Sequence, residues 1–215
     1  MTFLATCVAI SACLGVALGC SPSTDGDRSL DEEICTPYNA NENSFDTRIE
    51  SREQLEQLHE SGCSRVRGSL RVMFVSGVTD LRLLEHIEHV DNSLEIAYNP
   101  DLRSLEGVGQ IDGFHSLTII QNDALERAST RAPIESGELG GRVTVHHNDE
   151  LRRLQVLEGL ATVDHGAIDI INNARLEKVD GLQSLERFES GYADIHGNPN
   201  LPQCEVEQVF EQVDI

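Results

Sequence analysis

Apolar and polar residues alternate in short stretches along the chain, and each stretch ends in a turn. In the stretch LEIAYNPDL, Leu94 and Ile96 alternate with residues of the opposite face, and a turn follows at Asn99. This alternation predicts a short β-strand with one buried face. Leucines return beyond the turn at Leu102 and Leu105. A second apolar side of the chain is therefore expected to point back into the same core.

The same pattern recurs at a nearly constant spacing. The motif apolar-x-apolar-x-x-Asn-x-x-Leu occurs five times, as LEIAYNPDL, LTIIQNDAL, VTVHHNDEL, IDIINNARL and ADIHGNPNL, with successive starts 23 to 26 residues apart. A weaker copy begins at Leu70, 24 residues before Leu94. A fixed period in the twenties is typical of a solenoid built from stacked supersecondary units.

One such unit cannot bury its own apolar faces, so neighbouring units must cover them. We expect each strand to pair with the copies above and below in a parallel sheet, about 4.8 Å apart. The predicted fold is mainly β, a parallel β-helix-like solenoid of about six coils with short helical caps at both ends. The predicted boundaries are 35–66 for the N-terminal cap, 67–201 for the coils and 202–215 for the C-terminal cap helix.

The asparagine of each copy is predicted to have a structural role. Stacking places these residues in one column, and each side-chain amide can pair with backbone groups that the turn leaves free. A catalytic or ligand-binding asparagine would not recur on every coil. The members of this predicted ladder are Asn99, Asn122, Asn148, Asn173 and Asn198.

Two segments have the pattern of capping helices. Ser51 and Gln54 have the spacing of a capping box, and Leu55 and Leu58 follow on one face. The segment from Pro202 begins with proline and carries apolar residues at helical spacing. The first helix is expected to cover the first coil and the second helix the last coil.

The N-terminus has the pattern of a targeting segment. Residues 3–19 are apolar and uncharged, and the segment ends in Leu18-Gly19-Cys20, so that 1–19 is predicted to be a secretory signal. This ending resembles the lipobox of bacterial lipoproteins, in which the cysteine is lipidated, so Cys20 is the expected lipidation site. Residues 20–34 are then a flexible acidic tether. A plain signal and an uncleaved anchor helix are the alternatives.

The remaining cysteines suggest one disulfide. Cys7 and Cys13 lie within the predicted signal, which leaves Cys35, Cys63 and Cys204 for an oxidising compartment. A bond between Cys35 and Cys63 would contribute about 3 to 4 kcal/mol of stability in the chain-entropy model. Buried thiols are the less favoured alternative. Cys204 could stay free, pair with another molecule or compete for one of the other two.

Composition narrows the range of partners. The chain has 37 acidic and 16 basic residues, a net charge of −21, no tryptophan and only 4% aromatic residues. Nucleic acid is a poor partner, because binding needs cations that face phosphates and aromatic rings that stack on bases. An anionic bilayer would repel this surface, so membrane attachment requires an anchor.

The repeats and their N-terminal flank resemble a known family. A cysteine-led segment with a helix, then GCSRVRGSLRV at 62–72, then coils of the pattern L-x-I-x-x-N-x-x-L-x-x-L resemble the receptor L domain over about residues 35–213. The resemblance implies a right-handed solenoid, a disulfide between Cys35 and Cys63, and a role in ligand recognition, as in the ligand-binding lobes of insulin and epidermal growth factor receptors. Related domains occur in bacterial surface lipoproteins. The receptors' other parts have no counterpart here, so signalling is not implied.

Residues that point outward from the strands vary from coil to coil. Among them are isoleucines at positions that are usually polar, and exposed apolar residues can mark a contact surface. The hypothesis is that this sheet face binds a protein or a glycan. An alternative is an ordinary half-covered sheet face beside the loop 126–142. The candidate binding residues are Tyr98, Ile120, His146, His147, Ile171 and His196.

Two other classes compete with this hypothesis. Asp169 and Asp194 are expected on neighbouring coils, as in polysaccharide-cleaving β-helices, although a solvated acidic face is favoured. No catalytic or metal-binding motif is present, and His146 and His196 are expected about 10 Å apart, too far to share a metal. The sequence therefore predicts a non-enzymatic recognition or adhesion module without a cofactor or metal, exported and lipid-anchored at the outer membrane or cell surface. A structural envelope protein is the remaining alternative.

Overall fold

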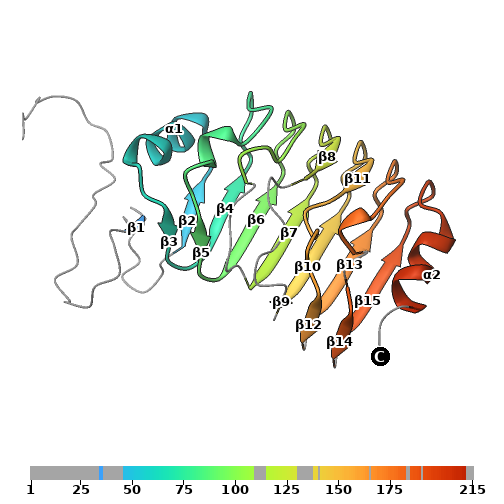
Figure 1. Ribbon diagram of the computed structural model, residues 1–215. Helices are drawn as coiled ribbons and strands as arrows, with labels where there is room; N and C mark the ends of the chain where they lie inside the picture. Colours follow the sequence, from blue (N-terminus) through green and yellow to red (C-terminus); the bar gives the residue numbers. More distant parts are fainter. Residues whose placement is uncertain are drawn as a thin grey trace, which may run out of the picture.

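A single parallel sheet runs along one side of the molecule (Figure 1). The computed structural model describes residues 34–35, 46–108, 115–129, 138–139, 141–164, 166–182, 185–189 and 191–211. The signal segment, Cys20, most of the tether and the last four residues lie outside these ranges. In spatial order the strands of this main sheet are β15 (Tyr192–His196), β13 (Ala167–Ile171), β10 (Arg142–His146), β7 (Ser116–Ile120), β6 (Ser93–Ala97), β4 (Leu70–Met73) and β2 (Thr47–Ile49).

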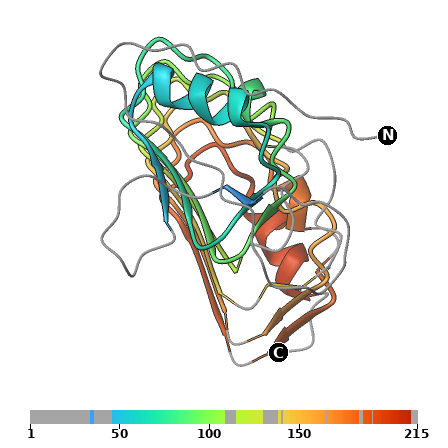
Figure 2. The same ribbon diagram turned by 90° about the vertical axis from the view of Figure 1, so that its left-hand side faces the viewer.

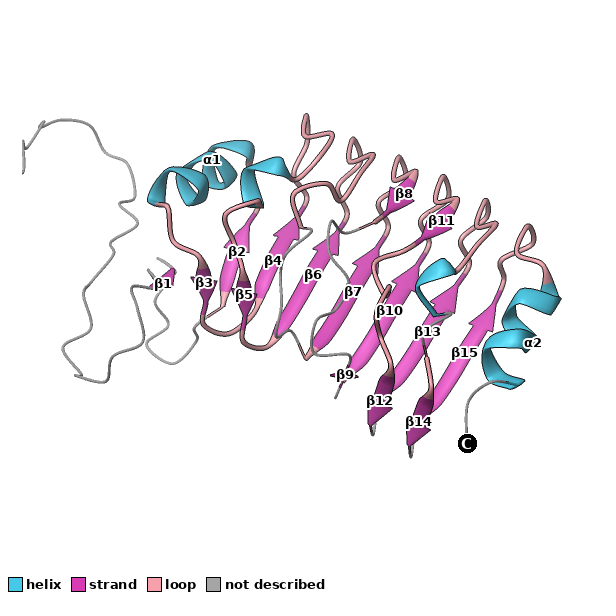
Figure 3. Ribbon diagram, in the orientation of Figure 1, coloured by secondary structure: helices cyan, strands magenta, loops and turns pink. Residues whose placement is uncertain are grey.

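The rest of each coil carries shorter elements that return the chain to the main sheet (Figure 3). All pairings between the described strands are parallel, so each element stacks on its counterpart in the next coil. One small sheet holds β8 (Arg127–Ala128) and β11 (Arg153–Leu154). Two others hold β1 (Ile34–Cys35), β3 (Arg65–Val66) and β5 (His89–Val90), and β9 (Glu138–Leu139), β12 (Thr162–Asp164) and β14 (Arg187–Glu189). Short 3-10 helices lie at η1 (Arg82–Leu84) and η2 (Asp180–Leu182).

Aliphatic side chains in register fill the interior. Leu94 pairs with Leu117, Ile96 pairs with Ile119, and all four are fully buried. Stacked coils thus bury continuous columns that no single coil could cover. The predicted class is confirmed: the fold is mainly β, a parallel solenoid of about five turns. Figure 2 views it from the N-terminal end, with the coils one behind another.

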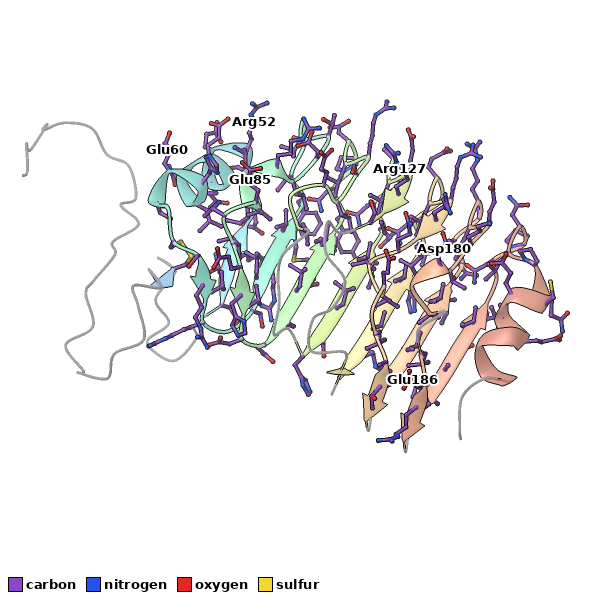
Figure 4. The ribbon with its side chains drawn as sticks, in the orientation of Figure 1. Arg52, Glu60, Glu85, Arg127, Asp180 and Glu186 are labelled. Carbon is purple, nitrogen blue, oxygen red and sulfur yellow. A yellow bond between two sulfur atoms is a disulfide. The ribbon has the colours of Figure 1, made fainter. Side chains whose placement is uncertain are left out.

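The N-terminal end is closed by α1 (Arg52–Ser61). The Ser51 side chain accepts a hydrogen bond from the Gln54 N–H, and the Gln54 side chain accepts one from the Ser51 N–H, so the predicted capping box is present. Leu55 is fully buried. A disulfide joins Cys35 to Cys63, in agreement with the expected pairing, and its sulfur atoms are visible beside β3 (Figure 4).

The C-terminal end is covered less completely by α2 (Gln203–Glu211). This helix lies within the predicted cap segment. Ala193 and Ile195 point into the interior from β15 but stay half-buried, as does Leu201 in the turn that follows. Cys204 is exposed and carries a free thiol. The last coil therefore leaves part of its apolar surface in contact with solvent.

Candidate functional site

The five asparagines form the expected ladder and hold the turns after the main strands. The Asn122 side-chain oxygen accepts the Asn99 N–H at 3.1 Å, and its amide nitrogen donates to the Ile96 carbonyl at 2.9 Å. Asn148 repeats both contacts one coil further on. Asn122 and Asn148 have no solvent exposure. These amides serve the backbone, so they are not available to a ligand.

The residue before each asparagine, and Phe74 before Val75 at the equivalent position of an earlier coil, adopts a left-handed backbone conformation. The φ angles are 59° at Phe74, 59° at Tyr98 and 54° at His147. Gly197 and Asn172 occupy the same position in later coils, at 70° and 56°. Glycine and asparagine tolerate this conformation, whereas a bulky side chain is strained in it. The turn therefore forces the side chain of this position outward at the edge of the sheet.

Phe74 and Tyr98 form a stacked aromatic pair at this edge. Their ring centroids are 4.9 Å apart with an interplanar angle of 12°. Phe74 is 54% exposed and Tyr98 is 39% exposed, although both are large apolar side chains. Stacking contributes about 0.5 to 1.5 kcal/mol, which offsets only part of the cost of two left-handed aromatic residues, at about 1 to 2 kcal/mol each.

A column of mostly apolar side chains continues from this pair across the outside of the main sheet. Register pairs Met73 with Ala97, Ala97 with Ile120, and Ile120 with His146 and then Ile171. Ala97 is buried although it points away from the core, and the other four are half-buried. An outward column of this kind is unusual, since solvated sheet faces are normally polar.

Imidazole and carboxylate groups occupy the C-terminal part of the same face. Burial lowers the pKa of His146, and the nearby His147 and His196 also lower it, while Asp169 and Asp194 oppose the shift. The shift favours the neutral form of His146, whose half-buried ring forms part of the apolar column. The His196 Nδ1 lies 2.6 Å from the Asp194 Oδ1.

Asp169 is unexpectedly covered for an outward residue. Its side chain is 8% exposed, and its carboxylate lies 3.4 Å from the Arg142 guanidinium. The same guanidinium lies over the ring of Tyr192, 5.8 Å from its centroid. Asp169 and Asp194 are paired in register, as expected, but each has a cationic or imidazole partner of its own.

The strand register places four of the candidate residues in one outward column, Ile120, His146, Ile171 and His196, whereas Tyr98 and His147 lie in the turns at its edge. Tyr98, His147 and His196 are exposed, and Ile120, His146 and Ile171 are half-buried. We define the outward face as Phe74, Tyr98, Ile120, His146, Ile171 and His196. The sequence interpretation missed Phe74, although it follows Leu70 at the same spacing by which Tyr98 follows Leu94. It also missed the pairing of Arg142 with Tyr192.

Charged residues along the turn edge pair with one another across coils. Arg103 lies 3.3 Å from Glu126, and Arg152 lies 3.1 Å from Glu177. Figure 4 shows this edge above the main sheet, with Arg127 labelled on β8. Exposed pairs of this kind contribute little stability, between about 0 and 1 kcal/mol each. They link side chains of neighbouring coils, while the strand pairings set the register.

Within the described ranges, no group of three or more His, Cys, Asp or Glu side chains is arranged to hold a metal ion. The two described α-helices and the 3-10 turns include no segment long and apolar enough to cross a bilayer.

The fold and the outward face define a parallel β-solenoid with an exposed aromatic and apolar surface. Comparisons with protein-family models, curated proteins and solved structures found no significant match for the chain. The resemblance to the receptor L domain therefore stays a prediction, because a solenoid shape alone does not specify a family.

Proposed function

We propose that the protein is a recognition or adhesion module that binds a protein or glycan ligand through the outward face. The observation that carries the proposal is the Phe74–Tyr98 pair. Two large rings stay exposed, and both occupy a backbone conformation that smaller residues adopt at lower cost. Strain at an exposed position without an evident gain in stability is typical of functional sites.

The surroundings of the pair suit a flat, extended contact. The apolar column of Ile120, His146 and Ile171 continues the surface along the sheet. Gln121 and His147 border it with exposed polar side chains. Apolar centres with polar borders are common in interfaces with proteins, and aromatic rings also stack on the C–H faces of sugars.

The test compares binding with stability in the same variants. The chain from residue 21 onward, produced solubly, is applied to a glycan array and to detergent-extracted cell-envelope proteins. Phe74→Asn together with Tyr98→Asn is expected to lower binding at least tenfold while leaving the thermal midpoint nearly unchanged, because asparagine fits the left-handed conformation. Glu158→Ala, at an exposed position outside the main sheet, is the control. Unchanged binding by the double variant would overturn the proposal.

We further propose that the chain is exported and attached to the outer membrane or cell surface by a lipid on Cys20. The apolar segment 3–19 and its Leu18-Gly19-Cys20 ending support this proposal. Metabolic labelling with an alkyne fatty acid should mark the wild type, and Cys20→Ser should remove the label. Labelling that persists in this variant would contradict the proposed attachment.

An enzyme that cleaves polysaccharides is a weaker candidate. Its support is the pairing of Asp169 with Asp194 on adjacent strands, but both carboxylates already have partners in Arg142 and His196. A screen for polysaccharide cleavage, with Asp169→Asn as the control, separates this class from a binding module. A structural envelope protein without a soluble ligand would show no binding in either assay.

A further inference from the structure

The main sheet ends at β15 with a free edge. β15 pairs with β13, and no other described strand lies beside it. Asn172 donates its N–H to the His196 carbonyl at 3.1 Å, so the backbone of His196 faces β13. Alternate residues of a strand face opposite edges, so Ala193 and Ile195 direct their N–H and C=O groups toward the free edge. Such an edge is a template for another strand.

The interior behind this edge is also incompletely covered. Ala193, Ile195 and Leu201 are half-buried, whereas the equivalent inward residues of the preceding coil are buried. Seen along the solenoid in Figure 2, α2 lies to one side of the line of main-sheet strands. A second strand could therefore approach β15 and cover Ile195 at the same time. We call the residues Ala193, Ile195 and Leu201 the open end.

Two arrangements with a second copy of the chain are possible. In a head-to-tail arrangement, β15 would face β2 of the next copy. At that end Ile49 is 3% exposed and Leu55 is fully buried, so the contact would cover apolar surface on one side only. It would also leave a free open end on each added copy. In a two-fold arrangement both open ends cover each other and the assembly closes.

The charges on β15 select one register for the two-fold arrangement. An axis through Asp194 would place two carboxylates opposite each other, which is unfavourable. An axis through Ala193 would move the partner's Asp194 away from His196, which would then contact only the Asp194 of its own strand. An axis through Ile195 pairs Asp194 with the partner's His196 twice, on the outside of the sheet. The sequence Asp194-Ile195-His196 is thus complementary to itself in the antiparallel direction.

This register also suits the backbone. Ile195 faces the partner's Ile195 as a hydrogen-bonded pair, because its N–H and C=O already point to the free edge. The ladder ends beyond this pair, because Gly197 has a φ of 70° and turns out of the strand. Inside the sheet the two Ile195 side chains meet, and each covers the other. Hydrogen bonding, charge pairing and apolar burial therefore all favour the two-fold axis through Ile195.

We propose that the protein forms a two-fold dimer in which β15 pairs antiparallel with the β15 strand of a second copy. The axis passes through the Ile195 pair, perpendicular to the sheet, so the main sheets join into one continuous sheet. Both outward faces then point to the same side. Two copies of the proposed binding surface would engage a multivalent target together. The dimer itself does not depend on the proposed function.

Site-directed cross-linking tests the register directly. All chains carry Cys204→Ser, so that the exposed thiol forms no adventitious bonds. Asp194→Cys and His196→Cys chains of different tag length are mixed in a buffer of reduced and oxidised glutathione. The mixture is expected to give a disulfide between the two variants, since facing Cα atoms of a non-hydrogen-bonded pair lie about 4.5 Å apart, within disulfide range. The disulfide occupies one of the two symmetry-related sites of this mixed dimer. At the other site His196 still lies opposite the partner's Asp194.

Three results would overturn the proposal. A disulfide formed by Asp194→Cys alone would place the axis at Asp194. A disulfide between Asp194→Cys and Arg48→Cys chains would indicate head-to-tail stacking. The absence of any product, with a monomer in sedimentation equilibrium of the Cys204→Ser chain at 100 µM, would exclude the dimer. Circular dichroism of each variant confirms that it is folded.

A charge exchange gives an independent test without new cysteines. His196→Asp places carboxylates opposite one another at both sites and is expected to weaken dimerisation at least tenfold. Asp194→His combined with His196→Asp restores opposite partners and should restore the dimer. If the double variant dimerises no better than His196→Asp alone, the proposed pairing is wrong. Glycan and protein binding is measured on a monomeric variant as well, so that the proposed function is tested separately from the dimer.

Discussion

At the N-terminal end of the solenoid the chain covers its own first coil, whereas at the C-terminal end the last coil stays partly open. Leu55 of α1 is fully buried and the Cys35–Cys63 disulfide fastens the segment that carries it. At the other end Ile195 and Leu201 are only half-buried. A solenoid gains stability from contacts between neighbouring coils, so each end needs a cover. One end obtains it from the chain, and we infer that the other obtains it from a second copy.

The largest loss of stability is expected from a substitution in the middle of the asparagine ladder. The same substitution at the last member of the ladder should cost much less. Asn148→Ala removes the partners of the Asn122 N–H and the Ile119 carbonyl, so it should lower the free energy of unfolding by about 4 kcal/mol. Asn198→Ala lies where water can replace the lost bonds, and it should cost about 1 kcal/mol. Urea unfolding of the monomeric His196→Asp background measures both values. Equal losses at the two positions would contradict the comparison.

Removal of the disulfide should cause the next largest loss of stability. Cys35→Ser with Cys63→Ser should lower the free energy of unfolding by about 3 to 4 kcal/mol in the chain-entropy model. The loss should be concentrated at the N-terminal end, so hydrogen exchange should accelerate in α1 and β3 while β13 keeps its protection. Exchange that accelerates equally in β13 would show that the two ends unfold as one unit.

Truncation of one apolar side chain at each end compares how much stability each end loses. Leu55→Ala leaves a cavity in a closed region and should cost about 3 kcal/mol, whereas Ile195→Ala in the monomeric background should cost about 1 kcal/mol because its side chain is already partly solvated. Thermal unfolding of both variants supplies the comparison. A larger loss for Ile195→Ala would mean that the open end is closed within one chain.

The smallest expected effect concerns pH at the N-terminal end. Burial lowers the pKa of His86, and the neighbouring His59 ring, 5.1 Å away, also lowers it, while the backbones of Leu58 and Leu83 and, to a smaller extent, Glu85 oppose the shift. The unfolded chain then binds a proton more readily than the folded chain. The contribution of neutral His86 to folding stability is therefore present above a pH of about 6.5 and is lost as the pH falls below it. His86→Phe keeps a ring beside His59 and removes the titration.

The free energy of unfolding should therefore decrease less between pH 7.5 and 5 in His86→Phe than in the wild type. Denaturant midpoints across this range provide the measurement. A steeper decrease in the variant would reverse the predicted sign.

The repeating part of the fold was predictable because the same residue types recur at the same spacing. Leu94, Ile96 and Asn99 have counterparts in later coils, and each counterpart occupies the predicted place. The capping box at Ser51 was predictable for a similar reason, because it depends on residues three apart. Local spacing of this kind needs no knowledge of distant contacts.

The site was predictable only in part, because its properties arise from contacts between coils. Phe74 lies in a degenerate copy in which Val75 replaces the asparagine, so the repeat alone did not identify it. The burial of Asp169 depends on an arginine one coil away, and alternation predicts it to be exposed. The open end depends on how well α2 covers β15, which helical spacing does not determine.

Hydrogen exchange at the free edge of β15 tests the account most directly. In the monomeric His196→Asp variant the Ile195 and Gly197 amides should exchange rapidly, while the Ile170 amide in β13 stays protected. In the wild type at concentrations that favour the dimer, the Ile195 amide should become protected as well. If Ile195 is as protected as Ile170 in the monomer, the C-terminal end is closed by the chain itself and the contrast between the two ends is wrong.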